Sequence, residues 1–283
     1  MSFSGKVKEE LAGQFSPARH CQVAEMAALL CGCGHVEKLP DGNTRLWIQT
    51  ENEAVARKCF TLLRKTFNIE TAIVIREGSH LKRGRVYLVE VTDPVRAEQV
   101  LQGTKLSVDN ETGLLEMDNS LVVQMSCCKR AFIRGTFLSS GSISDPEKGY
   151  HFEIVCPDRR KAEQLQGIIR SFHVEAKIVA RKKSYVVYVK EGAQIVDMLA
   201  VMEANVALMD LENIRILKEM RNSVNRKVNC EAANINKTVN AAVRQVEDIE
   251  LIGRTAGFES LSDGLAQVAR LRLQYPDATL KEL

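Results

Sequence analysis

The sequence predicts an α+β protein with two similar halves, each of order α-β-α-β-β-α, followed by an all-α region. Three observations support this class. The same order of helical and strand patterns occurs twice, a glycine ends the leading helix of each copy, and strand patterns disappear after about residue 205. The two glycines, Gly34 and Gly141, are 107 residues apart (141 − 34). Chance similarity between two unrelated α+β stretches is the alternative explanation.

The first copy begins with a helical pattern over residues 22–34. Its last helix begins at Asp93 and Pro94, because Asp caps helices and Pro suits the first helical position. The elements between them are a strand at 44–49, a helix at 53–67, and strands at 71–76 and 85–91.

The second copy begins with a helix over residues 128–140, and Asp158 caps a later helix that reaches about Phe172. Its other elements are strands at 150–155, 175–181 and 184–190 and a helix at 194–202. The two leading helices share small side chains along one face: Ala24, Ala27, Ala28, Cys31 and Gly32 in the first, and Ala131, Gly135 and Ser139 in the second. Small residues allow close backbone approach, so we expect these helices to pack together about a pseudo-two-fold axis.

Two nine-residue strings resemble the motif of the LAGLIDADG homing endonucleases: residues 26–34 and residues 133–141. The resemblance implies two central helices in a saddle that straddles DNA, with the last Asp of each motif binding a catalytic metal. Here those positions hold Cys33 and Ser140, and Mg²⁺ prefers carboxylate oxygens. Neither Glu37 nor Asp145 is placed like the missing acid. The sequence therefore predicts a non-enzymatic scaffold in which Cys33 and Ser140 are vestigial; a divergent metal-dependent DNA endonuclease is the alternative.

Residues 142–148, together with the string from Arg221 to Val239, resemble the WhiA family of regulators of sporulation and cell division in Gram-positive bacteria. This resemblance covers the whole chain. It implies a degenerate LAGLIDADG domain joined to a C-terminal helix-turn-helix domain that binds double-stranded promoter DNA. Another regulator or RNA polymerase is a candidate protein partner, and the implied location is the cytoplasm, at the nucleoid. The final helical pattern has barely begun at Leu283, so we expect the recognition helix to lie beyond it.

The helical region is more basic than the rest of the chain. Between Arg215 and Arg244 there are seven basic and two acidic residues, a charge of +5 (7 − 2), against +3 for the whole chain. Six Asn fall between Asn222 and Asn240. Lys and Arg neutralise phosphates, and Asn can bond phosphates or adenine edges. The candidate DNA-binding residues are Arg221, Asn222, Asn225, Arg226, Lys227, Asn229, Lys237 and Arg244; a solvated helix with an Asn-rich connector is the alternative.

Two basic turns join equivalent strands of the two copies and are candidate saddle contacts with DNA. They contain Lys82, Arg83 and Arg85 in the first copy and Arg181, Lys182 and Lys183 in the second. Solvated hairpin turns are the alternative. In a further alternative for the whole protein, the saddle senses a ligand or a protein and controls the helical domain.

Metal, cofactor and membrane sites are not predicted. Cys31, Cys33 and His35, taken with Cys127 and Cys128, lack the spacing of paired zinc ligands. No run of 18 apolar residues suggests a membrane span. The expected domains are an N-terminal helical segment at 1–19, two LAGLIDADG-like repeats at 20–125 and 126–204, a linker helix at 205–230, and an incomplete helix-turn-helix domain at 231–283.

Overall fold

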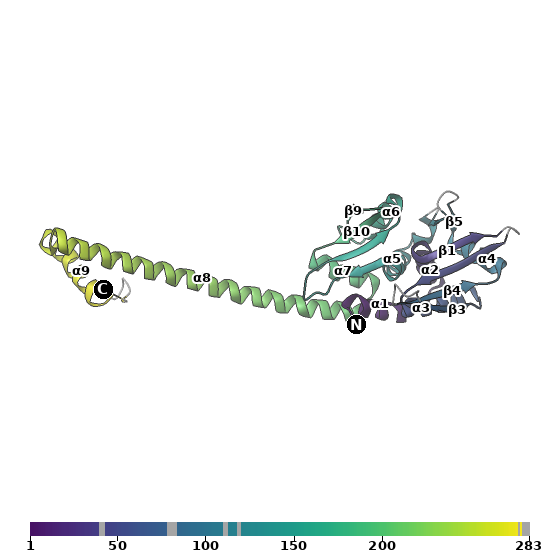
Figure 1. Cartoon of the computed structure of the whole chain (residues 1–283), viewed down its shortest axis with the longest axis horizontal. Helices are drawn as coiled ribbons and strands as arrows, with labels where there is room; N and C mark the ends of the chain where they lie inside the picture. Colours follow the sequence, from purple (N-terminus) through teal and green to yellow (C-terminus); the bar gives the residue numbers. More distant parts are fainter. Residues whose placement is uncertain (40–42, 78–83, 110–112, 118–119, 277, 279–283) are drawn as a thin grey trace. The chain divides into compact units, whose positions relative to one another are not determined.

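A computed structural model describes residues 1–39, 43–77, 84–109, 113–117, 120–276 and 278 (Figure 1). The chain divides into two compact units, Met1–Arg215 and Ile216–Leu283. The first unit contains the sheets and the second contains helices, which confirms the predicted α+β class with a following all-α region.

Helices α2 (Arg19–Cys33) and α5 (Ser126–Ser140) lie side by side at the centre of the first unit (Figure 1). They run parallel, since His20 meets Cys128 near their starts and Gly32 meets Ser139 near their ends. A Cβ built on Gly135 would stand 2.6 Å from the carbonyl oxygen of Glu25. The close packing predicted from the small residues is therefore present.

Two antiparallel four-stranded sheets flank this helix pair, with matching orders β1-β2-β4-β3 and β7-β8-β10-β9. The first sheet contains β1 (Gly34–Lys38), β2 (Thr44–Thr50), β3 (Ala72–Glu77) and β4 (Arg85–Val91). The second contains β7 (Gly141–Ile143), β8 (Phe152–Cys156), β9 (Lys177–Arg181) and β10 (Ser184–Val189). The equal orders confirm the predicted duplication.

Each four-stranded sheet has one strand more than predicted; the added strands, β1 and β7, follow the central helices without a loop. Gly34 and Gly141 make this direct passage possible. A Cβ at Gly34 would stand 2.5 Å from the oxygen of Leu30, and one at Gly141 would stand 2.7 Å from the oxygen of Phe137. The halves are therefore α-β-β-α-β-β-α, and the glycines serve close approach rather than a left-handed turn.

Three of the remaining helices of the first unit, α3, α4 and α6, begin directly after a capping residue. Asn52, Asp93 and Asp158 accept backbone N–H groups at the starts of their helices. The helices are α1 (Phe3–Gly13), α3 (Glu53–Phe67), α4 (Pro94–Thr104), α6 (Arg159–Arg170) and α7 (Gly192–Met202). The sequence missed a small hairpin of β5 (Leu106–Val108) and β6 (Leu115–Met117) and the 3₁₀ turn η1 (Ser120–Val123).

Helix α8 (Asn205–Thr255) begins in the first unit and continues into the second. It ends at Gly257, whose φ of 75° and N–H bond to the Ile252 oxygen close the last turn. The 3₁₀ turn η2 (Phe258–Ser260) and helix α9 (Asp263–Gln274) follow. The expected boundary between residues 230 and 231 falls inside α8, because the Asn-rich stretch is helical throughout.

Candidate nucleic-acid interface

The tips of the two central helices hold neutral side chains that are bonded to their own helices. The Cys33 thiol donates to the Leu29 oxygen at 3.1 Å, and the Ser140 hydroxyl donates to the Thr136 oxygen at 3.4 Å. Burial raises the pKa of Cys33 to about 12, so its thiol stays protonated near neutral pH. Asp145 is engaged elsewhere, accepting the N–H of Glu147 in a turn.

Lys8 of α1 lies close to the tip of α2. Its ammonium is 5.8 Å from the centre of the Phe137 ring, and its charge interacts with Cys33. Burial lowers the pKa of Lys8. Lys8, Cys33 and Ser139 also line an open cavity of about 810 Å³. A cationic side chain thus lies beside the position where the endonuclease motif carries a metal-binding Asp.

A buried ionic network lies at the middle of the helix pair. Glu25 of α2 accepts from Lys58 of α3 at 2.6 Å and from Arg134 of α5 at 2.9 Å, and all three side chains are at most 1% exposed. Arg134 also binds Glu203 at 2.9 Å, just before α8. Glu10 of α1 accepts two backbone N–H groups at the start of α8, at 2.8 and 3.0 Å. These bonds hold α1, α2, α3, α5 and the beginning of α8 in register.

The outward faces of the two sheets mix charges. On the first sheet Arg45 pairs with Glu90 at 3.2 Å and stacks over Trp47, with ring and guanidinium 5.5 Å apart. On the second sheet Arg181 lies 3.7 Å from Glu153. Paired carboxylates oppose phosphate binding, because each cation already has an anionic partner. Arg45 and Arg181 are therefore partly neutralised, and neither offers a free positive charge to a phosphate.

The basic turns of the two halves are only partly described. Lys82 and Arg83 lie outside the described residues, and Arg85 is an exposed residue at the start of β4. Lys182 and Lys183 form the exposed turn between β9 and β10, with Lys182 at a φ of 57°. Arg181 precedes this turn as the last residue of β9.

All eight candidate DNA-binding residues lie on α8 and are exposed. At 3.6 residues per turn, seven of them fall within an arc of about 160°, and Lys227 lies outside it. The seven are Arg221, Asn222, Asn225, Arg226, Asn229, Lys237 and Arg244. Exposed apolar side chains, among them Val224, Val228 and Ile235, lie outside the arc. The structure therefore brings the predicted polar residues onto one side of a single helix.

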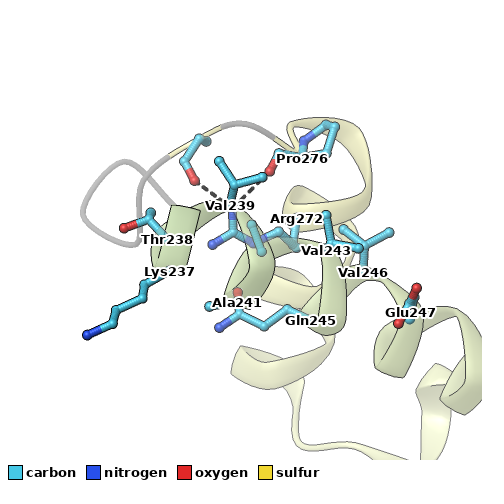
Figure 2. A pocket seen from close by; sticks show the side chains of 12 residues that line it. Lys237, Thr238, Val239, Ala241, Val243, Gln245, Val246, Glu247, Arg272 and Pro276 are labelled. Atoms are coloured by element: carbon cyan, nitrogen blue, oxygen red, sulfur yellow. Dashed lines mark hydrogen bonds between the residues drawn. The ribbon is translucent and has the colours of Figure 1, made fainter. Parts of the chain in front are cut away.

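A groove of about 690 Å³ lies between the later part of α8 and the end of α9 within the second unit (Figure 2). Val239 and Val243 of α8 line it, together with the buried Arg272 of α9. The Arg272 guanidinium donates to the backbone oxygens of Pro276 at 3.3 Å and Ala278 at 2.5 Å. This arginine ties the segment after α9 to the helix.

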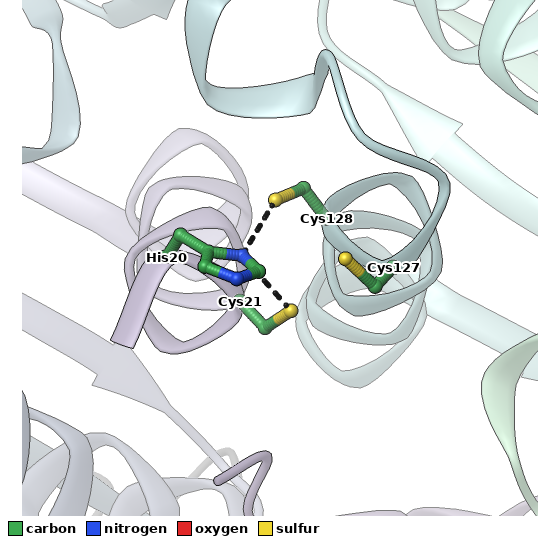
Figure 3. Close-up of side chains that lie close together, drawn as sticks. All are labelled: His20, Cys21, Cys127 and Cys128. Atoms are coloured by element: carbon green, nitrogen blue, oxygen red, sulfur yellow. Dashed lines mark hydrogen bonds between the residues drawn. The ribbon is translucent and has the colours of Figure 1, made fainter. Parts of the chain in front are cut away.

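The cysteines that the sequence analysis considered together as possible zinc ligands do not lie close to one another. Cys31 and Cys33 lie at the end of α2, whereas Cys127 and Cys128 lie at the start of α5. Parallel packing separates these ends by most of a 15-residue helix, about 20 Å. Instead, His20 and Cys21 at the start of α2 meet Cys127 and Cys128 (Figure 3). Sequence reasoning missed this group, although the 107-residue repeat equates His20 with Cys127 and Cys21 with Cys128.

Burial shapes the electrostatics of this group. Burial and the neighbouring thiols of Cys127 and Cys128 raise the pKa of Cys21 to about 12. Burial also raises the pKa of Cys128, with a further contribution from Cys127.

Among the described residues, no helix is both long enough and apolar enough to pass through a lipid bilayer.

Comparison with family models matches almost the whole chain to three WhiA domains. Residues 19–107 match the WhiA N-terminal LAGLIDADG-like domain, residues 129–221 the WhiA LAGLIDADG-like domain, and residues 224–283 the WhiA C-terminal HTH domain. The start of the last match, at 224, lies within α8.

Similar sequences and structures agree with these models. The "Probable cell division protein WhiA" of Lachnoclostridium phytofermentans is 58% identical over 285 residues, covering 100% of this chain and 91% of that protein. The protein of the same name from Alkaliphilus oremlandii is 46% identical over 288 residues, covering 100% and 89%. The crystal structure of full-length DUF199/WhiA from Thermatoga maritima superposes with a TM-score of 0.64 at 22% identity, covering 100% and 90%.

Proposed function

Because the chain belongs to the WhiA family, we propose that it is a sequence-specific DNA-binding transcription regulator that acts in cell division and sporulation. The observation that carries the proposal is the polar face of α8, where exposed Arg, Lys and Asn side chains share one side of the helix. Its partner is promoter DNA, which would place the protein in the cytoplasm at the nucleoid. Another regulator or RNA polymerase is a candidate protein partner for such a role.

We assign phosphate contacts to α8 rather than to the saddle. The stretch from Arg215 to Arg244 has a charge of +5, whereas Arg45 and Arg181 on the sheet faces are paired with Glu90 and Glu153. Each phosphate contact releases counterions, so contacts can be counted from the salt dependence of binding.

Salt dependence of binding to a labelled promoter duplex tests this assignment. Replacing Arg226 and Lys237 with Gln should lower the slope of log affinity against log salt by about 1.8, since each lost contact is worth about 0.9. The matched control replaces Lys182 and Lys183 with Gln on the β9–β10 turn and should leave the slope unchanged. A reduced slope in the control, with an unchanged slope in the α8 variant, would reassign the contacts to the saddle.

Sequence specificity needs a separate measurement. Genomic fragments selected on the full chain should share a motif, and an unlabelled duplex with that motif should compete far better than a random duplex. Equal competition by both duplexes would reduce the proposal to non-specific DNA binding.

We further propose that the protein does not cleave DNA. At the two motif positions the structure has a protonated thiol and a hydroxyl bonded to the helix backbone, and neither supplies the anionic oxygens that Mg²⁺ requires. Supercoiled plasmid incubated with the protein and Mg²⁺ or Mn²⁺ should stay supercoiled. Nicked or linear plasmid that disappears with the purified protein would establish the endonuclease alternative.

A further inference from the structure

Four side chains from the two central helices converge beside the starts of α2 and α5. His20 Nδ1 lies 3.2 Å from Cys128 Sγ and 3.3 Å from Cys21 Sγ, and the four ligand atoms, including Cys127 Sγ, all lie within 4.8 Å of one another (Figure 3). Cys21 and Cys128 are buried, while His20 and Cys127 are exposed. Among the described residues, this is the one group of three or more His, Cys, Asp or Glu that meets this distance.

The group is symmetric in a way that the fold explains. His20 and Cys127 are the second residues of their helices, Cys21 and Cys128 are the third, and 107 residues separate each equivalent pair. Parallel packing of α2 and α5 brings the two pairs together on the pseudo-two-fold axis. Each half of the saddle therefore contributes two ligands to one place.

The helix starts also favour negative charge at this position. Neither α2 nor α5 has a side-chain N-cap bond, as is also true of α7 and α9. Free N–H groups and the positive ends of two helix dipoles stabilise nearby anions such as thiolates. A cluster that carries net negative charge would be well placed at two uncapped helix starts.

We propose that His20, Cys21, Cys127 and Cys128 form a tetrahedral zinc site that joins the two halves of the saddle. Three sulfurs and one imidazole nitrogen are a ligand set of structural zinc. Bonds of about 2.0–2.3 Å place tetrahedral ligand atoms roughly 3.5–3.8 Å apart, so the observed separations need only small side-chain movements. The sequence predicted no metal site because these ligands form two adjacent pairs rather than paired cysteines with two residues between them.

Binding of Zn²⁺ to this group releases protons and leaves a defined net charge. Each of the three cysteines loses its proton to solvent as its sulfur bonds to Zn²⁺, while neutral His20 binds through Nδ1, so the bound cluster has a charge of −1 (2 − 3). All four positions are filled by protein, which makes the role structural rather than catalytic. Soft thiolates also exclude Mg²⁺, so this site is chemically separate from the lost nuclease centre.

Metal content and cobalt spectroscopy on the reduced full-length chain test the site. The protein should bind one Zn²⁺ per chain, and Co²⁺ alone should give the visible bands of a tetrahedral complex together with an ultraviolet thiolate-to-metal band. Zn²⁺ should also raise the unfolding temperature monitored by Trp47 fluorescence, since it binds the folded state. Folded, reduced protein that takes up neither ion would overturn the proposal.

Variants identify the ligands. C127S and H20Q change exposed residues, so both proteins should fold, and each should weaken zinc binding at least tenfold and alter the cobalt spectrum. C230S is the matched control, because Cys230 is exposed on α8 and lies outside the group. Unchanged binding in C127S and H20Q, or loss of binding in C230S, would contradict the assignment.

A disulfide is the competing use of these cysteines. Intact-mass analysis of protein purified without reductant distinguishes the two, because a disulfide removes two hydrogens and a zinc site leaves all thiols recoverable after chelation. A stable disulfide between Cys21 and either partner, with no metal bound after reduction, would replace the zinc site with a redox link.

Discussion

Replacing Gly135 with Ala tests the close approach of the two central helices. The new methyl group would stand 2.6 Å from the backbone oxygen of Glu25 and 2.7 Å from the Cβ of Ala28. Backbone must move to relieve such a contact, and overpacking of this kind costs about 1–3 kcal/mol. We therefore expect G135A to lower the free energy of unfolding by about 1–3 kcal/mol, even though Ala is intrinsically the better helix former.

Gly167 offers a matched control in α6. A Cβ built there meets nothing within 4 Å, so only the intrinsic preference for Ala operates. G167A should raise the free energy of unfolding by about 0.5–1 kcal/mol. The same substitution thus has opposite signs at the two positions, and the difference measures the helix contact.

Urea unfolding measured by tryptophan fluorescence reports the relevant unit. Trp47 is the single tryptophan and lies on β2 of the first sheet. If the parent, G135A and G167A have equal m values, which are the slopes of the free energy of unfolding against urea concentration, their unfolding midpoints can be compared directly. If G135A proves as stable as the parent or as G167A, the two backbones do not meet as described, and the packing argument fails.

Three further predictions concern buried and thiol groups. E25Q should lower the free energy of unfolding by about 3–5 kcal/mol, because it removes the carboxylate that pairs with buried Lys58 and leaves Arg134 with Glu203 alone. Burial lowers the pKa of Lys58, with Glu25 partly opposing the shift, so the folded state binds fewer protons than the unfolded state between that pKa and 10.5. The contribution of Lys58 to the free energy of unfolding therefore grows as pH rises through this window, and loss of Glu25 widens the window. The difference in free energy of unfolding between the parent and E25Q should accordingly shrink with pH in urea titrations. A difference that does not change with pH would contradict this account. In R272M the backbone oxygens of Pro276 and Ala278 lose their donor, so the second unit should unfold at a lower urea concentration by circular dichroism. The unfolding transition of the first unit, monitored by Trp47 fluorescence, should not move. A shift of both transitions would show that the effect of Arg272 is not confined to the second unit. Iodoacetamide at pH 8 should label the exposed Cys230 and spare the half-buried Cys33, because a pKa of about 12 keeps the Cys33 thiol protonated. Peptide mass mapping can check this, and rapid labelling of Cys33 would show that the helix tip opens.

Much of the first unit could be predicted because capping and periodicity agree there. Helix α3 has the predicted bounds, since Asn52 caps its start and Asn68 ends it with a φ of 55°. Strands β1 and β7 were missed because segments of five and three residues are too short for an alternating pattern to be recognised.

Features that depend on partners distant in sequence were harder to predict. The network around Glu25 joins residues from several helices, and no local pattern signals a buried carboxylate. The group of His20 and Cys127 became visible only once the helices were known to run parallel. By contrast, the candidate DNA-binding residues of α8 could be selected from local charge and Asn content alone; their role in DNA binding stays a prediction.

Lys8 affects any attempt to restore endonuclease activity to this scaffold by substitution. Helix α1 brings an ammonium group to the tip of α2, beside Cys33. An aspartate introduced at 33 would therefore meet an internal counter-ion already in place, and the resulting salt bridge would compete with any incoming divalent ion. We therefore expect aspartates at 33 and 140 to bind a divalent ion more weakly than the same two substitutions combined with K8M.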